Sequence, residues 1–213
     1  YQNKKFSYIT FYKRRIRRIL PVLFFVITVS IPFAYLSLLP NSLINFTKSI
    51  IYSLGFSSNF YFYFSGQEYS AVESIFNPFL HTWSLSVEEQ FYLIFPFFFV
   101  LVFFKFQKKL ILTILIVLLI SFILSVFQTE VNASKSFYFI HARFWELLSG
   151  SLVACFEYKN QFNKVSKKLT NFLVNLSFVV IICCFLFFDQ STKHPSYLTL
   201  FPIISCCIIL LFA

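Results

Sequence analysis

Long apolar runs separated by short polar stretches set the pattern of this chain. The runs cover residues 19–39, 43–64, 84–104, 110–127, 137–156, 171–188 and 196–213. Each is close to the roughly 20 residues that a helix needs to cross about 30 Å of hydrocarbon. The alternation typical of strands is absent, so helices are the expected way to satisfy the backbone in lipid. The pattern predicts an all-α, polytopic membrane bundle of six or seven membrane segments.

The composition excludes an ordinary soluble domain. Hydrophobic residues make up 58% of the 213 residues and charged residues 12%, whereas soluble domains carry roughly 25% charged residues. The net charge of +10 comes from basic residues clustered between the apolar runs. In a soluble protein such a charge would suggest nucleic acid. Here it is better explained by membrane topology, and no nucleic-acid partner is expected.

The basic residues also allow a test of topology, because cytoplasmic loops are enriched in Lys and Arg. If all seven segments cross, nine basic residues fall on one side and seven on the other. If 43–64 does not cross, or a short crossing lies within 65–83, the division becomes fourteen against two. The second arrangement fits the rule better. Segment 43–64 is therefore either a crossing helix or a re-entrant or interfacial element.

The chain has the features of a fragment. It contains no Met and begins with Tyr1, and its last run is still apolar where it stops. We therefore expect truncation at both ends. The five cysteines lie in or at the end of apolar runs without Cys-x-x-Cys spacing. They are interpreted as small helix residues, and no metal site is expected.

A polar stretch that begins at His81 precedes the third apolar run, and it reads His-Thr-Trp-Ser-Leu-Ser-Val-Glu-Glu-Gln-Phe-Tyr. Such groups at the mouth of a membrane helix usually face a cavity or each other. On a helix Ser84, Glu88 and Tyr92 share one face at spacings of four, and His81 joins them if the helix begins early. A histidine and a carboxylate on one cavity could perform acid–base chemistry, so His81 and Glu88 are the catalytic candidates.

A structural interpretation of the same stretch stays open. Ser86 and Glu89 fit a capping box, in which Ser-x-x-Glu precedes an apolar run. Trp83 and Tyr92 could be anchors at the membrane interface. Glu88 is not explained by that cap, which favours a functional role for it.

Two more charged groups are candidates. Arg14, Arg15 and Arg18 belong to a basic cluster before the first apolar run. They could orient the segment and touch anionic lipid, or converge on a polyphosphate, since guanidinium binds phosphate oxygens bidentately. Further along, Arg143 and Glu146 are spaced to pair on a helix. They could form a structural ion pair or belong to a site.

Four blocks of residues resemble, in order, the motifs of the acyltransferase-3 family of membrane O-acyltransferases. The blocks are Phe11-Tyr12-x-Arg14-Arg15-x-x-Arg18-Ile19-x-Pro21, Ser58-Asn59-Phe60-Tyr61-Phe62, the stretch from His81 to Tyr92 with Pro96, and Arg143-x-Trp145-Glu146-Leu147. The stretch from His81 is the most specific of them. The resemblance covers most of the chain, from about Phe11 to about Phe201.

The resemblance implies a multi-pass protein of the bacterial inner (cytoplasmic) membrane that moves an acyl group, usually acetyl, from acyl-CoA to a sugar hydroxyl. The acceptor would be a cell-envelope polysaccharide such as lipopolysaccharide O-antigen, peptidoglycan or exopolysaccharide, or a lipid-linked sugar. No bound cofactor is implied; acetyl-CoA is a donor substrate, and the surrounding partner is membrane lipid. Residues 1–213 would be a partial domain that lacks the family's first two membrane helices, including an Arg and a catalytic His. The fragment alone would then be inactive.

The resemblance also implies roles for the candidate residues. Arg14, Arg15 and Arg18 would bind CoA phosphates, and His81 and Glu88 would act at the reaction site. The residues that would shape or brace the substrate cavity are Trp83, Ser84, Tyr92, Arg143 and Glu146. The alternative function is a transporter or flippase for lipid-linked sugars, which intramembrane polar groups also suit.

Overall fold

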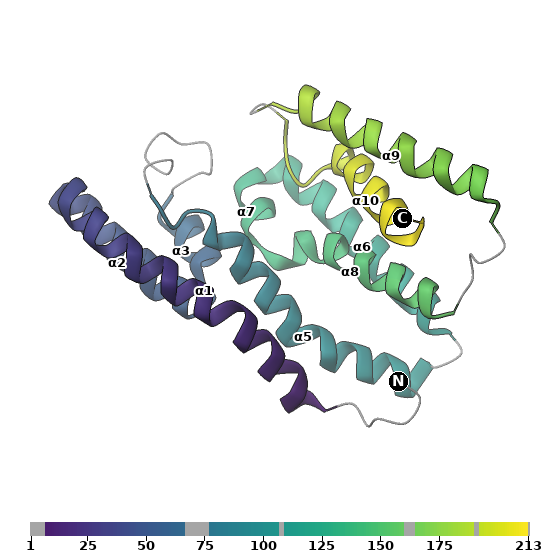
Figure 1. The fold of residues 1–213 in the computed structure, drawn as a ribbon, viewed down its shortest axis with the longest axis horizontal. Helices are drawn as coiled ribbons and strands as arrows, with labels where there is room; N and C mark the ends of the chain where they lie inside the picture. The colour runs from purple at the N-terminus through teal and green to yellow at the C-terminus, as the bar shows by residue number, and fades with distance from the viewer. Residues whose placement is uncertain (1–6, 67–76, 107–108, 160–164, 190–191, 213) are drawn as a thin grey trace. The chain divides into compact units, whose positions relative to one another are not determined.

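The computed structural model describes residues 7–66, 77–106, 109–159, 165–189 and 192–212, without the side chains of 104–106. All regular secondary structure in these ranges is helical, which confirms the predicted fold class (Figure 1). The elements are α1 (Tyr8–Ser37), α2 (Pro40–Leu54), α3 (Ser58–Phe64), α5 (Thr82–Phe106), α6 (Leu110–Val131), α7 (Ala133–Tyr138), α8 (Ile140–Tyr158), α9 (Lys167–Phe187), the 3₁₀ helix η2 (Tyr197–Thr199) and α10 (Leu200–Phe212). The chain forms two compact units, Tyr1–Glu89 and Gln90–Ala213, which are described one at a time.

In the first unit α1 packs against α2. Ser7 caps α1, and its hydroxyl accepts a hydrogen bond from the Thr10 N–H at 3.4 Å. The helix therefore begins before the basic cluster, so these residues lie on its first turns and not in a loop as the sequence suggested. The core of the unit joins α1, α2 and the segment before α5. Its buried residues are Leu23, Ile27, Ala34, Phe46 and Phe79.

The predicted segment 43–64 is two helices and not one. α2 ends at Leu54, and α3 begins at Ser58. Between them Phe56 adopts a φ of 50°, a left-handed conformation that costs a non-glycine residue roughly 1–2 kcal/mol. Pro40 at the start of α2 stands where a missing N–H costs nothing. A single helix across 43–64 is therefore excluded.

In the second unit aromatic side chains join α5 to α8. The Phe91 ring stacks on Phe95 at 5.0 Å and meets Phe144 of α8 edge-on at 5.0 Å. Phe91, Ile114 of α6 and Leu148 of α8 form a buried core cluster. In lipid, close van der Waals packing is what holds apolar helix surfaces together, so this cluster fixes α8 against its neighbours.

Helix α6 carries a line of small polar residues in an otherwise apolar sequence. Ser121, Ser125 and Thr129 recur every fourth position, and all three are buried. α6 packs closely against α8 and also contacts α7. The hydroxyls are therefore on a protein-facing side of a helix whose other sides are exposed.

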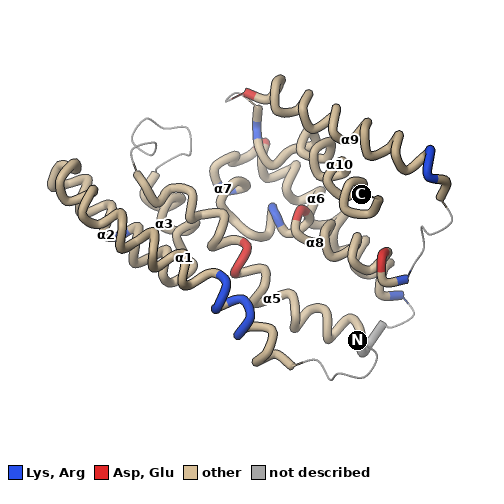
Figure 2. Tube along the Cα trace, in the orientation of Figure 1, with Lys and Arg blue, Asp and Glu red and all other residues tan. Residues whose placement is uncertain are grey.

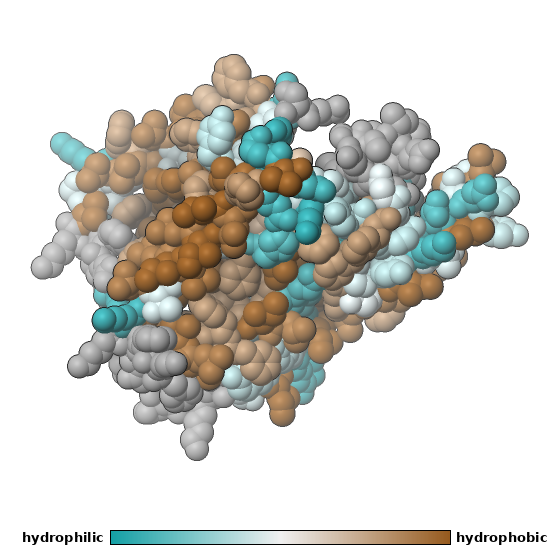
Figure 3. Space-filling view, turned by 180° about the vertical axis from the view of Figure 1, so that it is seen from behind, coloured by the Kyte–Doolittle hydropathy of each residue, from teal (hydrophilic) through white to brown (hydrophobic). Residues whose placement is uncertain are grey.

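Among the described residues, four helices are long and apolar enough to cross a membrane: Tyr8–Ser37, Thr82–Phe103, Leu110–Val131 and Lys167–Phe187. This is fewer than the six or seven predicted. The predicted segment 137–156 is divided between α7 and α8 at the extended residue Phe139, and α10 has only 13 residues. Large apolar side chains stay exposed, with Phe185 of α9 at 85%, and Figure 3 shows broad apolar areas on one face. Lipid is the solvent that such a surface requires.

Candidate functional site

The first charged cluster lies in the first unit. The Arg15 Nη1 and Glu89 Oε1 atoms are 3.8 Å apart, and the two side chains keep 25% and 16% of their exposure. The Arg15 guanidinium also lies over the Phe11 ring, 5.2 Å from its centre, a cation–π contact. Arg15 is therefore anchored to the start of α5 and is the least available of the three predicted phosphate-binding arginines.

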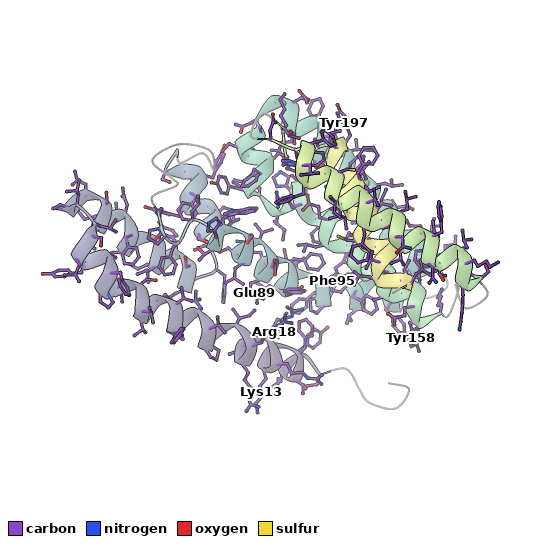
Figure 4. The ribbon with its side chains drawn as sticks, turned by 45° about the horizontal axis from the view of Figure 1, so that its top comes forward. Lys13, Arg18, Glu89, Phe95, Tyr158 and Tyr197 are labelled. Atoms are coloured by element: carbon purple, nitrogen blue, oxygen red, sulfur yellow. The ribbon has the colours of Figure 1, made fainter. Side chains whose placement is uncertain are left out.

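Arg14 and Arg18 differ from Arg15 because both are exposed. Glu88 is exposed as well, and the positive charges of Arg15 and Arg18 act on its carboxylate. Figure 2 shows the blue band on α1 and the red segment of α5 that carries these charges, and Figure 4 labels Arg18 and Glu89. The structure thus brings one predicted catalytic residue, Glu88, into the field of two predicted phosphate-binding residues.

The start of α5 corrects the capping interpretation. The helix begins at Thr82, so Ser86 is inside the helix and cannot be its cap. Ser86 is buried and forms a hydrogen bond with Ser58 at 2.7 Å. Glu89 pairs with Arg15 and is not part of a capping box. Glu89 therefore has a structural contact, but its partner is Arg15 of α1 and not the N-terminus of α5.

The remaining candidates of this stretch are spread around the helix start. His81 is exposed, and its carbonyl accepts a hydrogen bond from the Ser84 hydroxyl at 3.1 Å. Trp83 is buried with 7% exposure. Tyr92 is partly buried in the second unit, with its ring edge-on to Phe91 at 5.6 Å.

The second charged cluster lies in the second unit, at the start of α8. Arg143 Nη1 and Glu146 Oε2 are 3.6 Å apart, which confirms the predicted pairing. The Arg143 guanidinium lies over the Phe137 ring at 4.8 Å. Burial raises the pKa of Glu146, and the charge of Arg143 opposes this. Burial lowers the pKa of Arg143, and Glu146 opposes that. The two opposite charges therefore favour each other's ionised form.

His194, in the loop before η2, lies within the electrostatic influence of Arg143. Burial lowers its pKa first, and the charge of Arg143 lowers it further. Its loop is held by the ion pair of Lys193 Nζ with Glu130 Oε2 at 2.7 Å and by the Thr129 hydroxyl, which donates to the Pro195 carbonyl. The only signal in the sequence was a histidine beside a proline at the start of an apolar run, which is too common to identify a site.

Ser121 was also missed, because a serine within an apolar run carries no signal of its own. Its hydroxyl donates to the His141 carbonyl at 2.8 Å and accepts from the Trp145 N–H at 3.1 Å. One hydroxyl of α6 thus contacts two backbone groups of α8 that lie four residues apart. The first turn of α8, which carries Arg143, is fixed to α6 by this side chain.

The described residues contain no group of three or more His, Cys, Asp or Glu that could hold a metal ion. The polar groups on the two units are arginines, carboxylates, hydroxyls and histidines. Such groups can bind anionic ligands, move protons and stabilise developing negative charge. This chemistry suits group transfer to a hydroxyl.

Comparisons with known proteins agree with this chemistry. The family model described as an acyltransferase domain matches residues 1–213. An uncharacterised protein of Haemophilus influenzae is 36% identical over an alignment of 219 positions. The alignment covers 98% of this chain and 88% of that protein. The peptidoglycan O-acetyltransferase OatA of Listeria monocytogenes is 30% identical over 192 residues, 88% of this chain. The O-acetyltransferase OatA of Staphylococcus aureus is 32% identical over 158 residues, 72% of this chain.

The match covers only 30% of the Listeria protein and 26% of the Staphylococcus protein, so the chain spans less than a third of either. No solved structure matches the chain. The family model nevertheless covers the chain from end to end, and the helices have the length and apolar character of a multi-pass membrane protein. The chain therefore belongs to the acyltransferase-3 family of membrane acyltransferases.

Proposed function

We propose that the protein transfers an acyl group, acetyl in the simplest case, from acyl-CoA to a hydroxyl of a cell-envelope glycan in the bacterial inner membrane. Two relatives are named as O-acetyltransferases, and the name of one specifies peptidoglycan. Peptidoglycan is accordingly the first acceptor to test, followed by O-antigen and exopolysaccharide. A lipid-linked sugar is the acceptor form that would reach the membrane.

The observation that carries the proposal is the arrangement of arginines on α1. Arg14 and Arg18 are exposed and lie one helical turn apart, so their guanidinium groups can approach one ligand. A guanidinium binds phosphate oxygens through two parallel N–H bonds. CoA presents several phosphate groups. Arg14 and Arg18 would bind them directly, and Arg15, which is paired with Glu89, would hold α1 in place.

The proposed chemistry follows from the other charged residues. A sugar hydroxyl must lose its proton as it attacks the thioester carbon, and the oxyanion that forms needs positive or hydrogen-bond-donating groups. Collapse of this intermediate breaks the C–S bond, and CoA leaves as the thiol after taking up a proton. Glu88 and His81 are the proposed proton acceptors. The substrate-binding residues that the family resemblance implies are Trp83 and Ser84 in the first unit and Tyr92, Arg143 and Glu146 in the second.

Binding of tritiated acetyl-CoA to the chain in lipid nanodiscs tests the donor site. Arg14→Lys and Arg18→Lys each keep the charge but remove the planar fork, and we expect about a fivefold to tenfold loss of affinity for each. Arg17→Lys is the matched control, since Arg17 is an exposed neighbour on the same helix outside the family motif. If all three variants bind acetyl-CoA as tightly as the parent chain, the phosphate site is rejected and a role of the arginines in topology or transport is favoured.

Glu88→Gln tests the catalytic assignment in the full-length protein. The substitution preserves size and removes the carboxylate, so acyl transfer should fall by about a hundredfold or more if Glu88 acts as a base. Acetyl-CoA binding and membrane insertion should be retained. Wild-type acyl transfer by this variant would remove Glu88 from the reaction.

A further inference from the structure

A buried group of hydroxyls joins three helices of the first unit. Ser53 Oγ of α2 lies 2.7 Å from Thr82 Oγ1 of α5. Thr82 Oγ1 lies 3.0 Å from Ser58 Oγ of α3, and Ser58 Oγ lies 2.7 Å from Ser86 Oγ of α5. Ser53, Ser58 and Ser86 have at most 1% exposure. These four side chains, the hydroxyl cluster, form one continuous line of contacts at hydrogen-bond distance, among which four O–H protons are shared.

The main-chain carbonyls around the hydroxyl cluster indicate whether it can relay protons or only position helices. The Thr82 hydroxyl reaches the Phe79 carbonyl at 2.7 Å, and the Ser86 hydroxyl reaches the Thr82 carbonyl at 3.2 Å. Ser53 reaches the Ser49 carbonyl at 2.7 Å. Three of the four hydroxyls thus have a main-chain carbonyl as acceptor. A carbonyl holds a donor in place but has no proton to pass on, so the cluster suits positioning and not proton transfer.

The cluster lies on the same line of α5 as the ion pair. Thr82, Ser86 and Glu89 follow one another at spacings of four and three residues, which places them along one face of a helix. The first two bond to α3 and, through Thr82, to α2. The third meets Arg15 of α1. Rotation of α5 that broke the hydroxyl contacts would also carry Glu89 away from Arg15.

We propose that Thr82, with the three serines of the hydroxyl cluster, is a positioning residue that sets the rotation of α5 and so holds Glu89 against Arg15. Rotation of α5 would take the Thr82 and Ser86 hydroxyls away from the buried Ser58 hydroxyl, whose contacts are with those two side chains, and losing such a contact in low-dielectric surroundings is unfavourable. The effect on acyl-CoA binding rests on the proposed function, since Arg15 anchors the helix that carries Arg14 and Arg18. The effect on geometry does not rest on it.

The geometry is tested by cross-linking. In a chain whose five cysteines are replaced by serine, Arg15→Cys and Glu89→Cys introduce one thiol on each helix and remove the ion pair. The rate of reaction with a short bis-methanethiosulfonate reagent then reports how well packing and the hydroxyl cluster hold the two positions together. Thr82→Val keeps the shape and removes the hydroxyl, and we expect about a fivefold slower reaction.

Two variants separate this role from general loss of stability. Thr82→Ser restores the hydroxyl, so it should react at the rate of the parent. Ser49→Ala removes an equally buried hydroxyl that bonds only within α2, to the Phe46 carbonyl at 2.6 Å, and it should not slow the reaction. If Thr82→Val does not yield folded protein, Ser58→Ala takes its place. A parent rate in Thr82→Val or Ser58→Ala overturns the proposal.

Acetyl-CoA binding gives the second readout, with Arg15 and Glu89 intact. Thr82→Val should weaken tritiated acetyl-CoA binding about fivefold, and Thr82→Ser should restore it. Slower cross-linking with unchanged affinity would overturn the link to the donor site. If the unmodified chain binds no acetyl-CoA, the donor-site proposal fails, while cross-linking still decides whether the hydroxyl cluster positions α5.

Discussion

The partial burial of Arg15 and Glu89 allows us to predict the coupling free energy of their ion pair. Two opposite charges 3.8 Å apart attract by about 4 kcal/mol at an effective dielectric constant of about 20. Part of this is offset by the hydration that both groups lose, since their side chains keep only 25% and 16% of their exposure. We expect a net coupling of about 1–2 kcal/mol.

A double-mutant cycle measures this coupling. The variants are Arg15→Gln, Glu89→Gln and the double substitution, and the free energy of unfolding is measured by SDS titration in mixed micelles. The control cycle is Lys193→Gln with Glu130→Gln, a pair that is closer, at 2.7 Å, but has exposures of 51% and 65%. Exposed pairs contribute about 0.5 kcal/mol or less. If burial determines the coupling, the more distant pair has the larger value.

Either of two results would refute this reasoning. A coupling below about 0.5 kcal/mol for Arg15 and Glu89 is what independent sites give, and it would mean that the two charges do not interact. A coupling for Lys193 and Glu130 that equals or exceeds it would mean that distance matters more than burial.

Three other substitutions have expected outcomes. Ser121→Ala deprives the Trp145 N–H of its bond to α6, so the free energy of unfolding should fall by about 1 kcal/mol, measured by the same titration. Leu148→Ala should lower the free energy of unfolding by about 2–5 kcal/mol, because Leu148 is fully buried. A decrease below about 1 kcal/mol would show that neighbouring side chains relax to fill the cavity. Burial and Arg143 lower the pKa of His194, so the unfolded chain binds the proton more readily. Stability should therefore fall as the pH drops below about 6.5, and thermal unfolding of His194→Asn should show less of this loss.

The sequence predicted what depends on local spacing. The helical class follows from the apolar runs, and the pairing of Arg143 with Glu146 follows from one helical turn between them. The cap at Ser86 was wrong because the start of α5 depends on contacts made by Thr82 with other helices. Neither propensity nor a short motif contains that information.

The breaks in the apolar segments were not predictable for a related reason. Phe56 and Phe139 interrupt helices, yet phenylalanine is not a residue that marks turns. Phe56 packs against the buried core of the first unit, a contact that a local pattern does not contain. In the same way, the pairing of Arg15 with Glu89 joins residues far apart in sequence, so no local spacing could predict it.

The polar line on α6 has a consequence for how the protein assembles. Helix α6 has a mean hydropathy of 3.2 over its best window, so it can enter the bilayer as an independent helix. Lipid offers no partner to Ser121, and association with α8 does. The hydroxyl line leaves the insertion of α6 favourable and gives the inserted helix one side with which to recognise its neighbour. Order of assembly and choice of partner are thus encoded in different residues of the same helix.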